Sequence, residues 1–175
     1  MKTRPVIPLF VLALIAGTCH LSARTEPPAH AKAAPSTQLQ LTIDGKTSTV
    51  TLSDLAAMPQ KSVMVHNDHT KKDESYSGVA LGDLLAKYGF AVGQPTRRKM
   101  LHSYIVAEGT DQYWVLYSTT EVESSEHTAD VVVATSIDGK SLGDDGGLKL
   151  VASADKKPQR WVRNLSAIRL VMVVE

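Results

Sequence analysis

Polar and apolar residues alternate with a period of two in the first part of the domain. Residues 38–43 (QLQLTI) and 47–52 (TSTVTL) follow this pattern, which is typical of half-buried β-strands. An Asp-Gly pair lies between the two segments, and Gly45 can adopt a positive φ without steric cost. The two segments therefore predict a hairpin with a tight turn.

Two short helices are predicted among the strands. Ser53 is expected to cap the first, which ends before Pro59. Residues 80–88 predict the second helix, and Gly89 follows it as a typical helix stop. The apolar side chains of this second helix recur at helical spacing on one face: Leu81, Leu84, Leu85 and Tyr88.

The remaining segments predict more strands, separated by polar loops. Residues 62–66 predict a strand, and residues 66–74 (HNDHTKKDE) and 93–99 (GQPTRRK) predict loops. The second half adds five predicted strands: residues 101–107, 112–118, 130–137, 148–152 and 167–174. The third of these contains the run VVVA, apolar on both faces, which predicts a central buried strand. Together these elements predict an α+β fold with a mixed β-sheet and short helices.

The N-terminal segment has a different organisation. Lys2 and Arg4 precede a short apolar stretch, residues 6–16, and small residues follow through Ala23. This order is typical of a secretory signal peptide, and the stretch is shorter than the roughly 20 residues that span a bilayer. We therefore expect a signal peptide over residues 1–23 and a periplasmic or secreted protein.

The signal peptide is followed by a predicted tether and one domain. Residues 24–37 are rich in proline, alanine and polar residues, which is typical of a flexible linker. Residues 38–175 are enough to bury a hydrophobic core as a single domain. The single cysteine, Cys19, precedes this domain, so no disulfide is expected within it. Lipidation of Cys19 and an uncleaved signal segment are the alternatives that would attach the chain to a membrane.

The charge balance argues against a nucleic-acid partner. The chain has 19 basic and 18 acidic side chains and a formal net charge of +1. A nucleic-acid surface normally shows a clustered basic excess, and single-strand binding relies on aromatic residues, which make up only 5% of this chain. We expect an unknown small ligand or a periplasmic protein as the partner.

Four short motifs follow one another through the domain. They are residues 76–85 (YSGVALGDLL), 107–113 (AEGTDQY), 133–142 (VATSIDGKSL), and 147–151 (GLKLV) with 160–168 (RWVRNLSAI). Their order resembles that of the molybdopterin-binding domain of the sulfite-oxidase superfamily, from about residue 39 to residue 174. The resemblance implies that fold, in a family of molybdopterin-dependent oxidoreductases.

One departure from the family pattern bears on function. In catalytic members the strand before the first motif ends in a cysteine that ligates molybdenum, and a basic stretch follows that grips the pterin. The corresponding residues here, 63–69 (VMVHNDH), contain no cysteine. Thiolate is the soft donor that suits this metal, so its loss should disable the redox site. Imidazole is a substitute donor in principle, which makes His66 the candidate ligand at this position.

A histidine pair offers a second type of metal site. His66 and His69, with Asp68 between them, have the H-x-x-H spacing that can supply two imidazoles to zinc or copper. We take both histidines as candidate metal ligands. The alternative, which we favour, is a solvated polar loop, because a histidine pair alone lacks the further ligands that specify a metal site.

A cluster near the C-terminus could bind an anion or a cofactor. Arg160, Trp161 and Arg163 combine guanidinium groups, which bond oxyanions in a bidentate way, with an aromatic ring for stacking. We take them, with His66, as candidate cofactor-binding residues. The alternative is that Trp161 closes the hydrophobic core and the two arginines are solvated.

Two classes of function follow from these residues. The first is an exported, non-catalytic binding or sensory module that keeps the fold, has no cofactor and is not an enzyme. The alternative is a molybdopterin-dependent oxidoreductase with atypical metal ligation. A Ser-His-Asp hydrolase is a third interpretation, but the G-x-S-x-G motif that presents a nucleophilic serine is missing from the sequence.

Overall fold

A computed structural model describes residues 34–68, 70–91, 96–123 and 130–173 of the chain. The strands are β1 (Gln38–Ile43), β2 (Lys46–Thr51), β3 (Lys61–Asn67), β4 (Lys72–Ala80), β5 (Ser103–Gly109), β6 (Trp114–Ser118), β7 (Val131–Ile137), β8 (Lys149–Ala152) and β9 (Leu165–Met172). The helices are α1 (Leu52–Ala56), α2 (Leu81–Lys87) and α3 (Arg97–Leu101), with short 3₁₀ turns η2 (Thr119–Val122), η3 (Gly143–Asp145) and η4 (Pro158–Arg160).

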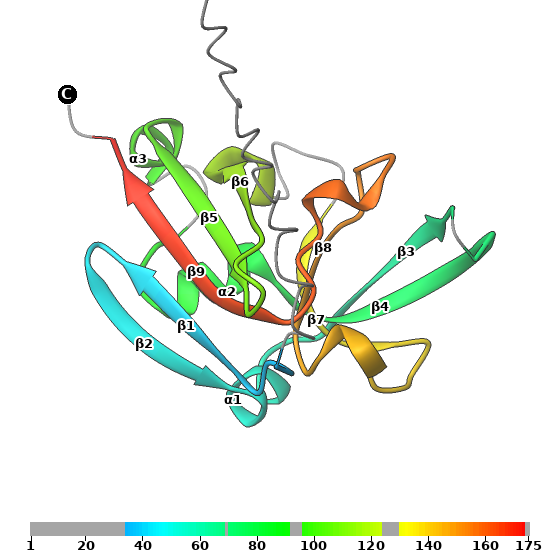
Figure 1. Cartoon of the computed structure of the whole chain (residues 1–175). Helices are drawn as coiled ribbons and strands as arrows, with labels where there is room; N and C mark the ends of the chain where they lie inside the picture. The colour runs from blue at the N-terminus through cyan, green and yellow to red at the C-terminus, as the bar shows by residue number, and fades with distance from the viewer. Residues whose placement is uncertain (1–33, 69, 92–95, 124–129, 174–175) are drawn as a thin grey trace, which may run out of the picture.

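The strands form two sheets that lie side by side (Figure 1). The five-stranded sheet has the order β2-β1-β9-β5-β6, in which only β1 and β9 are parallel. The four-stranded sheet has the order β3-β4-β7-β8 and is antiparallel throughout. The expected α+β fold with short helices is therefore confirmed.

One hydrophobic core joins the two sheets. The inward residues of β1 and β5, the run Val131–Ala134 of β7 and the apolar face of α2 are all buried in it. Helix α2 packs on β4 and β7, which explains why β7 is apolar on both faces. Its residues Leu81, Leu84 and Leu85 are fully buried, as their spacing predicted. Among the described residues, no helix has the length and apolar character needed to cross a membrane.

A close backbone approach connects β4 with β7 at Gly78. The register of this pair shifts at residues Ser77 and Gly78. A Cβ atom built on Gly78 would lie 2.0 Å from the Val133 carbonyl oxygen, closer than any real contact. Glycine is therefore required here by the packing of two backbones rather than by a turn.

The predicted loop over residues 66–74 is too long, because β3 continues to Asn67 and β4 begins at Lys72. Strands β3 and β4 pair in an antiparallel hairpin, with His66 opposite Asp73 and Asn67 opposite Lys72. Polar residues usually indicate a loop, but here the polar side chains of the two strands form hydrogen bonds with one another across the hairpin. The Glu74 carboxylate, for example, accepts a hydrogen bond from the Asn67 amide at 2.8 Å.

Two smaller predictions also need correction. Thr51, not Ser53, caps α1: its hydroxyl accepts from the Asp54 N–H while the Asp54 carboxylate accepts from the Thr51 N–H, as in a capping box. The Thr51 hydroxyl also donates to the Asp54 carboxylate at 2.7 Å, and this bond, together with the one from the Thr51 N–H, lowers the pKa of the Asp54 carboxyl. The predicted loop over residues 93–99 contains the start of α3, where Arg97 begins a helix, while residues 92–95 lie outside the described residues.

Candidate ligand pocket

A cavity of about 390 Å³ lies where the β3–β4 hairpin meets β8 and the segment after η4. Its lining residues come from all of these elements and from η3: His66, Asn67, Asp145, Lys149, Pro158, Trp161 and Arg163. The structure thus brings together three of the residues that the sequence singled out, His66, Trp161 and Arg163. His69 lies outside the described residues.

Lys149 provides a fixed positive charge in the pocket wall. Its side chain is only 8% exposed, and its Nζ atom donates to Asp145 Oδ2 at 2.7 Å and to the Tyr76 hydroxyl at 2.9 Å. The same Nζ lies 4.6 Å from the Tyr76 ring centroid and 5.3 Å from that of Trp161. A buried ammonium group is costly unless it is paired, and here a carboxylate, a hydroxyl and two aromatic rings compensate for the lost water.

The hydrogen bonds continue from Lys149 into the β3–β4 hairpin. The Tyr76 hydroxyl donates to Glu74 Oε2 at 3.0 Å, and Glu74 Oε1 accepts from Asn67 at 2.8 Å and from Thr70 at 3.1 Å. Burial, together with the hydrogen bond to Glu74, raises the pKa of Tyr76 well above its usual value. The phenol therefore stays protonated and serves as a bridge between the lysine and the glutamate.

These buried polar residues were not among the candidate site residues predicted from the sequence. Tyr76 lies in the first of the four motifs, but neither it nor Lys149, Glu74 and Asp145 had an assigned role. One signal was present, since Lys149 stands inside the apolar run of residues 148–152 and a lysine there must be paired. Its partners could not be inferred, because Tyr76 is 73 positions away in the sequence.

Trp161 forms the aromatic wall of the pocket. Its ring meets the edge of Tyr76 with 5.7 Å between centroids and an interplanar angle of 73°. The indole N–H donates to the Ala152 carbonyl at 3.0 Å, which fixes the ring orientation. Trp161 is buried, so it closes the core and lines the cavity at the same time.

Arg163 and His66 are the exposed basic groups of the pocket. The Arg163 side chain is 68% exposed, and its Nε atom lies 3.8 Å from Asp145 Oδ1, a loose ion pair. His66 Nδ1 lies 2.8 Å from Asp73 Oδ1, so the carboxylate holds the Nδ1–H tautomer and leaves Nε2 facing away from it. Of the two, Arg163 carries the permanent charge and has the freer geometry.

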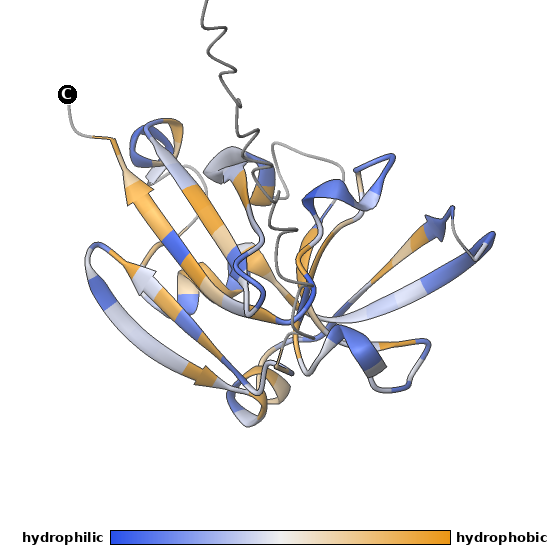
Figure 2. Ribbon diagram, in the orientation of Figure 1, coloured by the Kyte–Doolittle hydropathy of each residue, from blue (hydrophilic) through white to orange (hydrophobic). Residues whose placement is uncertain are grey.

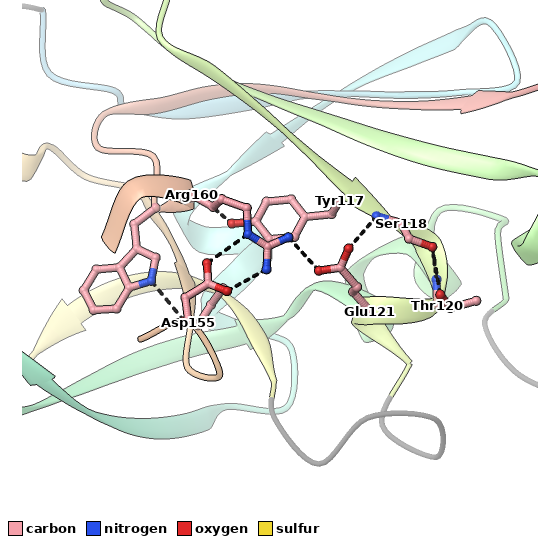
Figure 3. Close-up of polar contacts among 8 residues, drawn as sticks. Tyr117, Ser118, Thr120, Glu121, Asp155 and Arg160 are labelled. Carbon is pink, nitrogen blue, oxygen red and sulfur yellow. Dashed lines mark hydrogen bonds and ion pairs between the residues drawn. The ribbon is translucent and has the colours of Figure 1, made fainter. Parts of the chain in front are cut away.

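Arg160 belongs to a different cluster and does not line the pocket (Figure 3). Its guanidinium binds both oxygens of Asp155, at 3.0 and 2.6 Å, and Glu121 Oε2 at 2.6 Å. It also lies over the Tyr117 ring, 4.7 Å from the centroid, and the Tyr117 hydroxyl donates to the Arg160 carbonyl. The hydrogen bond to Asp155 raises the pKa of Arg160, and burial raises that of Tyr117.

A second, smaller hollow of about 240 Å³ is also lined by Arg163. It shares three residues with the main pocket, Pro158, Trp161 and Arg163, and adds Asp111 and Tyr113 from the β5–β6 turn. The guanidinium of Arg163 therefore borders both spaces.

The residues of the pocket do not fit a thiolate-bound molybdenum. The described lining residues include no cysteine, and Cys19, the single cysteine of the chain, lies outside the described residues. Within the described part of the chain, no group of three or more histidine, cysteine, aspartate or glutamate residues is placed to hold a metal ion. At the end of β3 the imidazole of His66 stands near the pocket instead, engaged by Asp73.

Comparison with known proteins identifies the fold. No protein-family model matches the chain, and no curated protein does. Solved structures that match include the crystal structure of the sulfane dehydrogenase SoxCD from Paracoccus pantotrophus, with a TM-score of 0.59 and 18% sequence identity over 76% of this chain. The chain has a sulfite-oxidase-like fold. It spans only 37% of the length of the SoxCD chain, so the likeness concerns the fold alone.

Proposed function

We propose that this chain is an exported, non-catalytic binding module whose pocket holds a small anionic molecule with a planar group. The observation that carries the proposal is the combination, in one cavity of about 390 Å³, of the open guanidinium of Arg163 with the aromatic wall of Trp161. Ligand pockets of this size with a few convergent polar groups are typical small-molecule sites.

The charges around the cavity favour a single negative group on the ligand. Lys149 is already neutralised by Asp145 at 2.7 Å, whereas Arg163 approaches the same carboxylate only to 3.8 Å. A ligand carboxylate can therefore take the free N–H groups of Arg163, and its planar part can lie toward Trp161. Asp145 would repel a ligand of higher negative charge, because like charges at short range are unfavourable.

Loss of the metal ligand supports a role without redox chemistry. The sulfite-oxidase-like scaffold is kept, but the residues that face the pocket lack the soft donor on which the family's metal depends. Fold does not fix function, and a cleft can be kept for binding after its chemistry has been lost.

Titration with benzoate, compared with neutral benzamide, tests the binding proposal. The chain has two tryptophans, so two indole N–H signals report separately by NMR on the pocket (Trp161) and on strand β6, whose Trp114 does not line it. We expect benzoate to shift the Trp161 signal and benzamide to do so at least tenfold more weakly. In the Arg163→Gln variant the benzoate effect should fall by about tenfold or more, because a charge-assisted hydrogen bond is lost. Arg98→Gln, an exposed arginine on α3, is the matched control.

The competing function, a molybdopterin-dependent oxidoreductase with atypical ligation, is favoured by the fold itself. Elemental analysis and the fluorescence of oxidised pterin, measured on protein from its native source, separate the two proposals. Molybdenum near one equivalent that disappears in His66→Ala would refute the non-catalytic proposal. A molybdenum content at background in both proteins is the result we expect.

A further inference from the structure

The outward face of the five-stranded sheet is divided into a polar and an apolar half. On β1 and β2 the outward side chains are polar: Gln40, Thr42, Thr47 and Thr49. On β5 and β6 they are mostly apolar: Tyr104, Val106, Trp114 and Leu116. In Figure 2, where the ribbon is coloured by residue whichever face the side chain is on, β2 is mainly white and blue and β5 carries more orange. We call the second set, together with Glu108 and Arg169, the apolar face.

The apolar face forms one shallow groove. All six of its residues line a single hollow of about 540 Å³. Trp114 is 58% exposed and Leu116 is 48% exposed. The residues that alternate with them along β6, Val115 and Tyr117, are buried in the core. Single exposed apolar residues are common, but several together in one groove with polar residues at its border are typical of an interaction site.

The edge strand next to the apolar face is partly occupied at its end, which favours docking of a partner on the face over strand addition. Strand β6 lies at the edge of its sheet and has only five residues. Its last residue, Ser118, donates its backbone N–H to the Glu121 carboxylate at 3.0 Å. Short edge strands with their backbone groups occupied are a known protection against edge-to-edge pairing.

The charges within the groove suit a second copy of the same chain. Arg169 Nη1 and Glu108 Oε2 lie 2.9 Å apart inside the apolar face. Two copies related by a two-fold axis bring the same surface together, so each arginine can meet the glutamate of the other copy. A surface that carries an acidic and a basic side chain next to each other is self-complementary in this arrangement. A surface with charges of one sign would repel its copy.

We infer that the apolar face is a two-fold dimer interface, in which the five-stranded sheets of two copies pack face to face. Face-to-face sheets about 10 Å apart would interdigitate the Trp114 and Leu116 side chains of both copies. The apolar face has six residues on three strands, fewer than the roughly 20–30 residues per partner of a standard interface. We therefore expect a weak dimer whose population rises with protein concentration.

Sedimentation velocity over a range of protein concentrations tests this inference. Leu116→Glu, or Leu116→Ser if the charge impairs folding, should raise the dimer dissociation constant at least tenfold. Thr49→Glu, on the polar half of the same sheet face, should leave it unchanged. A wild-type protein that stays monomeric at millimolar concentration overturns the inference, as does a Leu116 variant that dimerises as well as Thr49→Glu.

A charge exchange tests the two-fold pairing itself. Glu108→Arg gives the apolar face of each copy two arginines, at positions 108 and 169, and Arg169→Glu gives it two glutamates. Because like charges then meet across the interface, each variant alone should dimerise at least tenfold more weakly. An equimolar mixture should recover dimers, because the two variants are complementary to each other. A mixture that associates no better than the separate variants contradicts the pairing.

Discussion

Arg160 and Arg163 stand three residues apart and have opposite environments. The Arg160 guanidinium is held by two carboxylates, those of Asp155 and Glu121, and lies over the Tyr117 ring. The Arg163 side chain is mostly exposed and touches one carboxylate loosely, at 3.8 Å. The first arrangement links three turns of the structure, and the second leaves a charge free beside a cavity. The two arginines therefore divide the region into a structural cluster and a binding pocket, and the following variants test that division.

The largest effect on stability is expected within the pocket, at Lys149. Lys149→Met removes the ammonium group that Asp145 and Tyr76 share, which leaves Asp145 with only its loose pair to Arg163 and Tyr76 with only its bond to Glu74. Breaking a buried pair in this way should lower the free energy of unfolding by about 3 kcal/mol. Urea denaturation followed by circular dichroism measures the change. An unchanged urea midpoint would show that the lysine is not the centre of the buried network.

Arg160→Gln should destabilise the protein by a smaller amount. The variant loses a bidentate pair with Asp155 and the bond to Glu121, but the side chains concerned are partly exposed. We expect a loss of about 1–2 kcal/mol, in the range for charge-assisted bonds of partly exposed groups. The same urea experiment applies, with Arg98→Gln as the exposed control, which should differ from wild type by less than about 0.5 kcal/mol.

Alkaline pH should destabilise both regions through their tyrosines. Tyr76 in the pocket and Tyr117 in the cluster both have a raised pKa in the folded protein because they are buried. The unfolded chain therefore loses these protons first, and stability falls as the pH rises above about 10, by up to about 1.4 kcal/mol per pH unit for each tyrosine. Urea midpoints between pH 9 and pH 11 test this. Tyr76→Phe and Tyr117→Phe should each reduce the slope, and equal slopes in all three proteins would contradict the assignment.

Arg163→Gln should have the smallest effect on stability. Its guanidinium is mostly exposed and its ion pair is long, so the free energy of unfolding should change by less than about 0.5 kcal/mol. A loss comparable with that of Arg160→Gln would mean that Arg163 is a structural residue and not a free ligand contact.

The sequence predicted the fold better than the chemistry of the site. Period-two alternation located the hairpin of β1 and β2, and helical spacing located α2, because these patterns depend on which face of a local segment is buried. The strand over residues 62–66 was predicted, but the start of β4 was predicted as part of a loop because its residues are polar and pair across the hairpin. A Thr-x-x-Asp signature at Thr51 and Asp54 was available for the first helix, but Ser53 is an equally good cap by composition.

The two arginines could not be distinguished from their sequence alone. Arg160 is the last residue of η4, and Arg163 follows this turn. Both were predicted as anion-binding residues with Trp161. Glu121, which binds Arg160, lies 39 positions away and on another element, so only the tertiary structure shows that Arg160 is occupied. The same holds for Lys149 on β8, whose hydroxyl partner Tyr76 lies on β4, with β7 between the two strands in the sheet.

Measuring stability and benzoate affinity together on Arg160→Gln and Arg163→Gln tests the division most directly. We predict opposite outcomes: Arg160→Gln loses about 1–2 kcal/mol of stability but binds benzoate within about twofold of wild type, whereas Arg163→Gln keeps its stability and loses affinity by about tenfold. The reverse pattern, in which Arg160→Gln abolishes binding and Arg163→Gln only destabilises the protein, would contradict the account.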